Sequence, residues 1–416
     1  MIAIPLLYFL LLTGYFYRKN GWGLDVASGL LLVAISLFAI VIDVKDLYGI
    51  YGNNKLAYNF WTIFLFCLQW TIILLPIHKI SALEVKTIDE VKLPSLKIMG
   101  IVLFFCSLYL IIFNLEDIKD ALILDPSEVR DQHYKNLAKG EKNGFNILAL
   151  IPTILTSTPF PTIALLLWFY MNSFIKGTHF ISIFLLLASI VQAVLGIIIA
   201  GRAAMIYWVF DFFLCYSFFY KFLNKEFKRT LNIVGLIFGS IIIVAFVTIT
   251  VSRYKGTTAD RDPLESLYGY AGQHINNFSI MMQEGHTAPF LPDRELPFLS
   301  NYILGIKYDM DSHYLKLMGT VKATVSVFDT YGAEIYLDLG IIAYILFHLF
   351  ILYIANHIEA SWKELTFDRI LLVGMMTAFF SHGLFAWPFT GHYTSMAIVF
   401  ILFLVYFFRF RFQLKL

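Results

Sequence analysis

Val251-Ser252-Arg253-Tyr254-Lys255-Gly256 begins a polar segment that ends with Phe328-Asp329-Thr330-Tyr331-Gly332-Ala333-Glu334. The segment covers residues 251–330, about 80 residues, and an apolar run flanks it on each side. Nowhere else does the chain place so many consecutive residues outside an apolar run. We therefore expect the chemistry of this protein to take place in or beside this segment.

The composition indicates an integral membrane protein. Hydrophobic residues make up 59% of the chain and charged residues 14%, whereas a soluble domain carries about 25% charged residues and about half apolar ones. The net charge is only +2, and no basic patch with interleaved aromatic residues occurs, so we expect no nucleic-acid partner. Cys67, Cys106 and Cys215 lie inside apolar runs without the spacing of metal ligands, which predicts small core residues.

Eleven apolar segments are candidates for membrane-spanning helices, each of which requires about 20 mostly apolar residues. They are residues 2–17, 24–42, 57–77, 98–115, 146–174, 180–200, 203–220, 231–250, 332–355, 370–389 and 393–408. The first and last are short, so the expected number is ten to twelve. The runs are continuous rather than alternating, which favours helices over strands. The predicted fold class is an all-α polytopic membrane protein.

Lysine and arginine in the short connections predict the orientation. Residues 18–19, 79–97, 176, 221–229 and 409–415 carry most of the lysines and arginines of the shorter connections, whereas 43–56 and 201–202 carry only Lys45, Lys55 and Arg202. The C-terminus is then cytoplasmic, and the large loop is external. The predicted organisation is transmembrane helices 1–8 in residues 1–250, an external loop in 251–331, and helices 9–11 with a short cytoplasmic tail in 332–416.

The external loop contains one readable helix. Asp262-Pro263-Leu264-Glu265 resembles a capping box with proline at the first helical position. Apolar residues follow at helical spacing as far as Met282, and Gly285 ends the pattern. We expect an amphipathic helix that lies along the outer membrane surface or caps the bundle. A second short helix is expected within residues 311–319.

The fifth span contains prolines that must interrupt its helix, in Ile151-Pro152-Thr153 and in Thr158-Pro159-Phe160-Pro161. Broken backbone at membrane depth persists only where protein or water satisfies it. The sequence leaves two interpretations open, a kinked packing helix and a break that lines a site.

Arginines beside the membrane are the first candidates for a binding site. Arg202 lies at the external end of a span, Arg253 lies at the start of the loop, and Arg261 and Arg294 lie within it. A guanidinium group binds phosphate with two parallel hydrogen bonds and stays charged. These arginines suit a lipid-linked pyrophosphate, and the alternative is that they extend to lipid head groups.

Acidic residues and histidines of the loop are candidates for acid–base chemistry. Asp262 and Glu265 are explained as helix caps, and His274 lies at the edge of the apolar face of the predicted helix, where it is either an interface residue or catalytic. Asp329 and Glu334 lie where the loop returns to the membrane, and a carboxylate there could serve as a general base. Asp260 and His313 are the remaining candidates. No His, Cys or carboxylate cluster has the spacing of a metal site.

Three short motifs in this layout resemble the Wzy-type oligosaccharide repeat-unit polymerases and the related O-antigen ligases. They are Gly201-Arg202-Ala203-Ala204, Ser252-Arg253-Tyr254, and the segment Phe328-Asp329-Thr330-Tyr331-Gly332-Ala333-Glu334-Ile335-Tyr336-Leu337-Asp338-Leu339-Gly340-Ile341-Ile342. Together they contain 22 of the 416 residues of the chain. The ligases place a histidine about eleven residues before the glycine of the last segment. Asp329 stands at that position here, which favours the polymerases.

The resemblance implies a bacterial inner-membrane glycosyltransferase. A glycan on undecaprenyl pyrophosphate would be transferred to a sugar hydroxyl of a lipid-linked repeat unit, without a metal or nucleotide cofactor. Arg202 and Arg253 would bind the departing pyrophosphate, and Arg261 or Arg294 that of the acceptor. Asp329, Glu334 or His274 would accept the proton, and Tyr254 and Tyr331 would contact sugar rings. A chain-length regulator is a further partner that the sequence leaves open.

Two other functions would also use such a cavity. An O-antigen ligase would transfer the finished polymer to lipid A core. A transporter or flippase of lipid-linked oligosaccharide usually has two related halves, which this sequence does not display.

Overall fold

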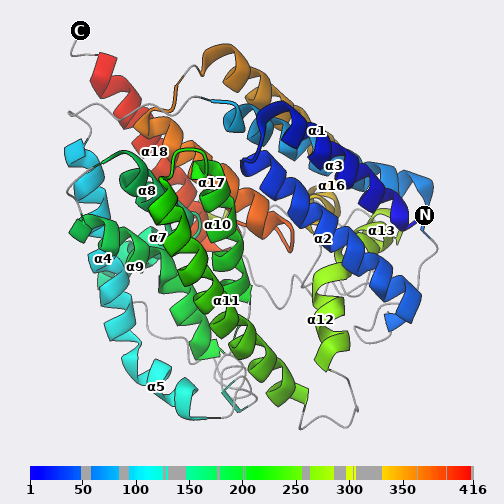
Figure 1. The fold of residues 1–416 in the computed structure, drawn as a ribbon, viewed down its shortest axis with the longest axis horizontal. Helices are drawn as coiled ribbons and strands as arrows, with labels where there is room; N and C mark the ends of the chain where they lie inside the picture. Colours follow the sequence, from blue (N-terminus) through cyan, green and yellow to red (C-terminus); the bar gives the residue numbers. More distant parts are fainter. Residues whose placement is uncertain are drawn as a thin grey trace. The chain divides into compact units, whose positions relative to one another are not determined.

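The fold is taken from a computed structural model of the chain. It describes residues 1–47, 58–83, 93–124, 128–129, 147–175, 179–199, 201, 203–254, 263–284, 297–302, 304–305, 330–362, 364–389 and 391–413. Within these ranges the chain forms helices and no β-strand (Figure 1). The fold class is therefore all-α, as predicted.

The chain divides into two compact units, which are described separately. The first unit consists of Met1–Val85, Leu264–Leu365 and Ala378–Ser395, and the second of Lys86–Pro263, Thr366–Thr377 and Met396–Leu416. Each unit combines helices from both halves of the sequence. The predicted division at residues 250 and 331 follows the chain rather than these units and stays a prediction of topology.

The first unit is built on three N-terminal helices that pack together, α1 (Ala3–Asn20), α2 (Leu24–Lys45) and α3 (Phe60–Ser81) (Figure 1). Gly29 allows α1 and α2 to approach closely, because a methyl group at this position would lie 2.2 Å from the Thr13 hydroxyl oxygen. The same unit contains α12 (Pro263–Gly272), α13 (His274–Glu284), α14 (Pro297–Tyr302) and α16 (Thr330–Ser361).

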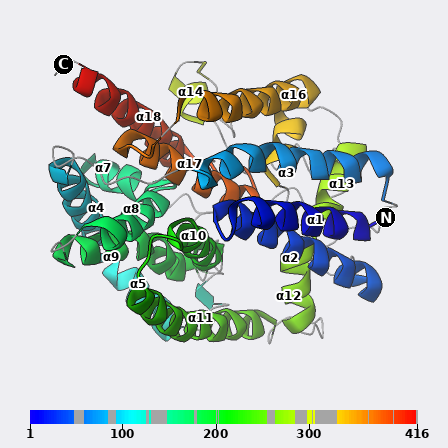
Figure 2. The same ribbon diagram turned by 45° about the horizontal axis from the view of Figure 1, so that its top comes forward.

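The longer part of α16 runs in the same direction as α3. The Tyr331 hydroxyl and the Tyr344 hydroxyl both reach Gln69, and further along both helices Lys79 pairs with Glu359. Figure 2 shows the two helices side by side. These helices occupy the third and the ninth of the eleven predicted spans. If successive spans cross the membrane in alternate directions, two odd-numbered spans must run in the same direction.

The second unit surrounds α8 (Phe160–Phe174), whose residues 162–171 are buried on all sides. It packs against α9 (His179–Leu195) and α10 (Ala203–Phe219). The other elements of this unit are α4 (Leu93–Phe113), α5 (Leu115–Ile123), α7 (Ile147–Thr156), the 3-10 helix η3 (Gly196–Ile199) and α11 (Lys225–Tyr254), with parts of α17 (Phe367–Gly383) and α18 (His392–Gln413).

Each of the eleven predicted segments is largely occupied by helix, but fewer helices qualify as spans by length and composition. Among the described residues five do: Leu24–Lys45, Phe60–Ser81, Leu93–Phe113, Phe180–Ile198 and Thr330–Glu359. The pair formed by Leu148–Thr156 and Phe160–Phe174 qualifies as a sixth if it is one bent span. The chain is therefore a helical membrane protein, and the number of eleven crossings and their orientation remain predictions.

The predicted interruption of the fifth span is confirmed. The α7 and α8 helices meet at a bend of 60°, and Pro159 precedes the first residue of α8. The backbone carbonyls freed there accept hydrogen bonds: Thr153 O from the Ser157 hydroxyl at 2.6 Å and Thr156 O from the Gln192 amide at 2.7 Å. Because protein groups satisfy the break, the structure favours a kinked packing helix over a break that lines a site.

The helix predicted from residue 263 to residue 284 exists, but it is broken in two and placed differently from our expectation. The α12 and α13 helices meet at Gln273. The α12 helix lies against α2, where the Phe38 and Tyr268 rings are 6.2 Å apart. The α13 helix packs against α2, α3 and α16 and is buried on every face from His274 to Met281.

Of the two placements expected for this segment, the one along the outer membrane surface is wrong for α13, because its side chains are buried, and the one in which it caps the bundle stays a prediction. Its polar residues Asn276, Asn277 and Ser279, which the helical pattern assigns to water, face the protein interior. A periodic pattern separates apolar from polar faces, but it cannot distinguish water from a polar protein environment. The short helix expected within residues 311–319 lies outside the described residues.

Candidate functional site

Three of the predicted site residues, His274, Tyr331 and Glu334, are buried in the first unit. Arg202, Arg261, Arg294 and Asp329 lie outside the described residues. Arg253 and Tyr254 form the end of α11, and the structure describes their backbone but not their side chains. The described part of the candidate site is therefore the group of residues around α13 and the start of α16.

The first ten residues of α16 form a short buried half-helix. Gly340 interrupts α16 with φ 82° and ψ 177°, a conformation that essentially only glycine adopts. Residues 341–361 beyond it rise about 30 Å at 1.5 Å per residue, which is enough to cross a bilayer. Residues 330–339 are thus free to serve as an interior segment rather than as part of the crossing.

The part of α16 after Gly340 has the exposure pattern of a lipid-facing helix. Ile342, Leu346, Phe350 and Tyr353, spaced by three or four residues, are 72%, 60%, 56% and 67% exposed. A continuous apolar stripe of this kind on a chain of this composition is expected to face lipid. Residues 330–338, by contrast, are buried apart from Tyr336.

Two carboxylates lie on this half-helix, four residues apart and therefore on the same face. The side chains of Glu334 and Asp338 are 2% and 0% exposed. Glu334 Oε2 accepts a hydrogen bond from the backbone N–H of Trp387, so this carboxylate also positions the irregular segment that follows α17. Ionisable groups inside a membrane protein are costly, and they mark functional sites by default.

Asp338 was not among the candidates chosen from the sequence, although a signal was present. It follows Glu334 by four residues inside an apolar run, and a helix brings residues at this spacing together. Asp338 belongs to the motif from Phe328 to Ile342, and the resemblance of that motif to the polymerases assigns it no role.

Tyr331 connects α16 to α3. Its hydroxyl donates to Gln69 O at 3.2 Å and lies 3.0 Å from His348 Nε2. His348 Nδ1 lies 2.7 Å from Tyr344 O, and because a carbonyl only accepts, Nδ1 carries a hydrogen. In the neutral ring Nε2 is then also an acceptor, so Gln69 O and His348 Nε2 compete for the single hydrogen of the Tyr331 hydroxyl.

The ring of Tyr331 is completely buried, with the Trp70 and Phe379 rings each 5.2 Å away. It therefore has no exposed face for a sugar, and we assign Tyr331 to the support of the half-helix. The half-helix also touches α3 at Gly332, where a methyl group would lie 1.9 Å from Gln69 Oε1.

His274 begins α13, and its ring contacts the ring of Phe385 edge to face at 5.0 Å. It is 1% exposed. His274 and Glu334 thus both contact the irregular segment between α17 and α18, His274 through Phe385 and Glu334 through Trp387. The structure brings these two predicted residues to the same part of the first unit.

Several polar atoms around α13 are buried without a hydrogen-bond partner among the described residues. They belong to Gln69 (Nε2), Gln273 (Oε1), Asn276 (Oδ1 and Nδ2), Ser279 (Oγ) and Thr330 (Oγ1). These side chains come from α3, α13, α16 and the turn between α12 and α13, and the three helices pack against one another. A buried polar group without a partner costs about 1–3 kcal/mol, so a concentration of them in an apolar protein indicates a place that holds water or a polar ligand.

A second buried polar cluster in the same unit shows the contrast. His78 Nδ1 lies 2.7 Å from Asp25 Oδ2, the Asn20 amide donates to Asp25 Oδ2 at 3.1 Å, and Asp25 N donates to Ser81 Oγ at 3.0 Å. Every charge of this cluster has a partner in α1, α2 or α3. We interpret it as a structural connection between these helices, and no local sequence pattern predicts it.

The electrostatic character of the described site is acidic and hydrogen-bonding. Among the described residues of the chain no lysine or arginine is buried, and no three His, Cys, Asp or Glu residues are placed to hold a metal ion. This part of the site can therefore accept a proton and bind hydroxyl or amide groups, whereas an anion such as pyrophosphate requires cations from elsewhere in the chain.

Comparison of the chain with protein-family models, with curated proteins and with solved structures finds no match.

Proposed function

We propose that this chain is a membrane glycosyltransferase that transfers a glycan from undecaprenyl pyrophosphate to a sugar hydroxyl of a lipid-linked repeat unit, on the outer face of a bacterial inner membrane. The observation that supports this proposal most is the pair of buried carboxylates, Glu334 and Asp338, on a half-helix broken at Gly340. The half-helix lies in the last of the three motifs that resemble the polymerases.

The reaction requires a base at the acceptor. The hydroxyl oxygen forms a bond to the anomeric carbon, and the bond between that carbon and the pyrophosphate oxygen breaks. The pyrophosphate leaves with the electron pair, and the hydroxyl proton passes to a carboxylate. We assign this role to the Glu334–Asp338 pair, with Asp329 and His274 as the other groups that the sequence offers.

The leaving group requires positive charge. Arg202 and Arg253 are the residues that we propose for binding the departing pyrophosphate, with Arg261 or Arg294 for the acceptor's pyrophosphate. Preorganised cations stabilise the charge that develops on a leaving group. Polar groups of α13, chiefly Asn276 and Ser279, are proposed to bind acceptor hydroxyls, because their buried hydrogen-bonding atoms have no partner within the described ranges.

The direct test replaces each carboxylate by its amide in the parent strain, Glu334→Gln and Asp338→Asn, with extracted polysaccharide separated on a gel. At normal protein level we expect at least one of the two to leave only single repeat units. Asp211→Asn is a matched control, because Asp211 is also buried, at 4% exposure, and accepts a hydrogen bond from Thr162 in the second unit. Full ladders from both variants would refute the assignment of the base.

The pyrophosphate role has a separate test, Arg253→Lys. Lysine keeps the charge but lacks the planar pair of donors, so we expect shortened polymer or single units. A ladder of normal length would remove Arg253 from the site while leaving the carboxylate assignment intact.

Transport of a lipid-linked oligosaccharide is the second candidate. The observation that favours it is the interruption of α16 at Gly340, because broken helices are typical of transporter binding sites. Cells without a transporter would accumulate single repeat units inside, and cells without a polymerase would display them outside. A ligase mutant would instead produce full-length polymer that is not attached to lipid A core.

A further inference from the structure

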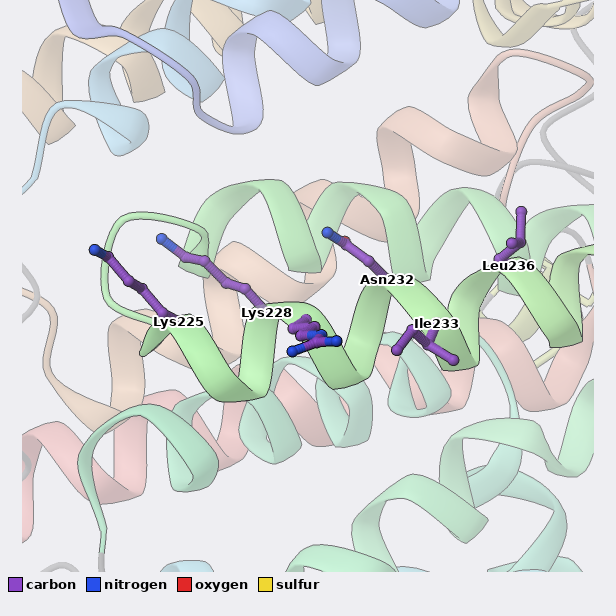
Figure 3. A pocket seen from close by; sticks show the side chains of 6 residues that line it. Lys225, Lys228, Asn232, Ile233 and Leu236 are labelled. Carbon is purple, nitrogen blue, oxygen red and sulfur yellow. The ribbon is translucent and has the colours of Figure 1, made fainter.

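The first three turns of α11 carry a basic surface that the proposed reaction does not use. Lys225, Lys228 and Arg229, together with Asn232, Ile233 and Leu236, line a shallow open pocket of about 470 Å³ (Figure 3). All six residues lie on one face of the helix, because they recur every three or four positions along it, at 225, 228–229, 232–233 and 236. We call this face the α11 basic pocket.

The α11 basic pocket changes from charged to apolar along the helix. The three cations occupy its first turns, and Ile233 and Leu236, which are 51% and 73% exposed, follow toward the apolar part of the helix. From Lys225 to Leu236 the helix rises about 16 Å. This order of groups matches an amphiphile with an anionic head and a hydrocarbon tail.

Contacts within the second unit hold the polar end in place. The ammonium group of Lys228 lies 4.1 Å from the centroid of the Tyr220 ring, and Asn232 Oδ1 accepts a hydrogen bond from the Tyr216 hydroxyl at 3.0 Å. Figure 3 shows Lys225, Lys228 and Asn232 projecting from the same side of α11.

The charge balance at the pocket is positive. Glu226 is the acidic residue in the first turn of α11, and at 100° per residue it lies about a quarter turn away from Lys225, at the edge of the face. It therefore offsets the three cations of the pocket only in part.

We propose that the α11 basic pocket binds the phosphate head group of an anionic glycerophospholipid, with the start of an acyl chain on Ile233 and Leu236. The basic stretch from Lys221 to Arg229, which includes the first turns of α11, is predicted to be cytoplasmic, and anionic lipids attract such basic groups at the cytoplasmic surface. This site belongs to the second unit, and it does not depend on the proposed transferase activity.

The experiment measures lipid binding to the full-length protein in detergent by native mass spectrometry. Phosphatidylglycerol is compared with phosphatidylcholine of the same chains, and inorganic phosphate is added as a competitor. We expect the Lys225→Gln/Arg229→Gln variant to bind phosphatidylglycerol about tenfold more weakly than the parent protein, since each cation near a lipid head group contributes severalfold to affinity.

The matched control is Arg18→Gln/Lys19→Gln, which removes two exposed cations from the last turn of α1. If the lipid binds at the α11 basic pocket rather than to any exposed pair of cations, this control should change the affinity for phosphatidylglycerol by less than about twofold. Leu236→Ser tests the tail contact without altering charge, and it should also weaken binding of phosphatidylglycerol. Equal loss in both double variants, or equal binding of phosphatidylcholine, would overturn the proposal. Displacement of the lipid by inorganic phosphate at equal concentration would show a free-phosphate site instead and would also overturn it.

Discussion

Replacement of Gly272 by alanine tests the placement of the loop helices inside the first unit. Gly272 ends α12 and lies against the backbone of α2. A methyl group at this position would be 2.4 Å from the carbonyl carbon of Phe38, 2.5 Å from its oxygen and 2.6 Å from Ala39 N. Carbon atoms in contact are about 3.5–4.0 Å apart, so α12 would have to move outward by about 1 Å.

Two effects of opposite sign determine how much Gly272→Ala changes the free energy of unfolding. Alanine favours helix over glycine by about 1 kcal/mol, and a group forced into a packed interior costs about 1–3 kcal/mol or more. The atoms that the methyl group meets are backbone atoms of a helix, which cannot rotate aside, so the upper part of the range applies. The expected net loss is about 1–2 kcal/mol, which lowers the Tm of a unit of this size by about 2–8 °C.

The assay is thermal unfolding of the purified protein in detergent, with Gly14→Ala as the control. Position 14 lies within α1 and has no atom within 4 Å of an added methyl group, so this variant should match or exceed the Tm of the parent. If α12 and α13 instead lay along the outer membrane surface, Gly272→Ala would meet nothing and would also stabilise. A Tm equal to or above that of the parent would therefore refute the buried placement.

Two further variants address α16. Gly340→Ala places a side chain at φ 82° and is expected to lower stability by about 1–3 kcal/mol and to shorten or abolish the glycan ladder, whereas Gly235→Ala, with open space around it, should do neither. Tyr331→Phe keeps the ring packing but removes the hydroxyl between Gln69 O and His348 Nε2. It is expected to lower stability by about 1–3 kcal/mol, and an unchanged Tm would show that this hydroxyl contributes little.

The helices of this protein follow from local sequence, because the thickness of the bilayer sets the length of an apolar segment and its backbone must be satisfied internally. Residues 24–42 and 57–77 were predicted as spans from composition alone, and α2 and α3 occupy them. The interruption near Pro159 was also predictable, since proline removes a backbone donor at a known position.

The site was only partly predictable. Glu334 and His274 were chosen because a charge or an imidazole beside an apolar run requires an explanation, and both are buried in the first unit. Asp338 could have been added from its spacing to Glu334. Arg202 and Asp329 lie outside the described residues, so their place in the site rests on the sequence.

The sequence by itself determined that the chain is a helical membrane protein and that ionisable groups stand at the start of α16. Only the tertiary structure decided that α13 is an interior helix and that Tyr331 bonds to Gln69, a partner 262 residues away. Apolarity and turn residues act over a few neighbours, so they can be read along the chain. A contact between distant helices depends on the shapes of both surfaces, such as the space beside Phe38 that admits only glycine at position 272.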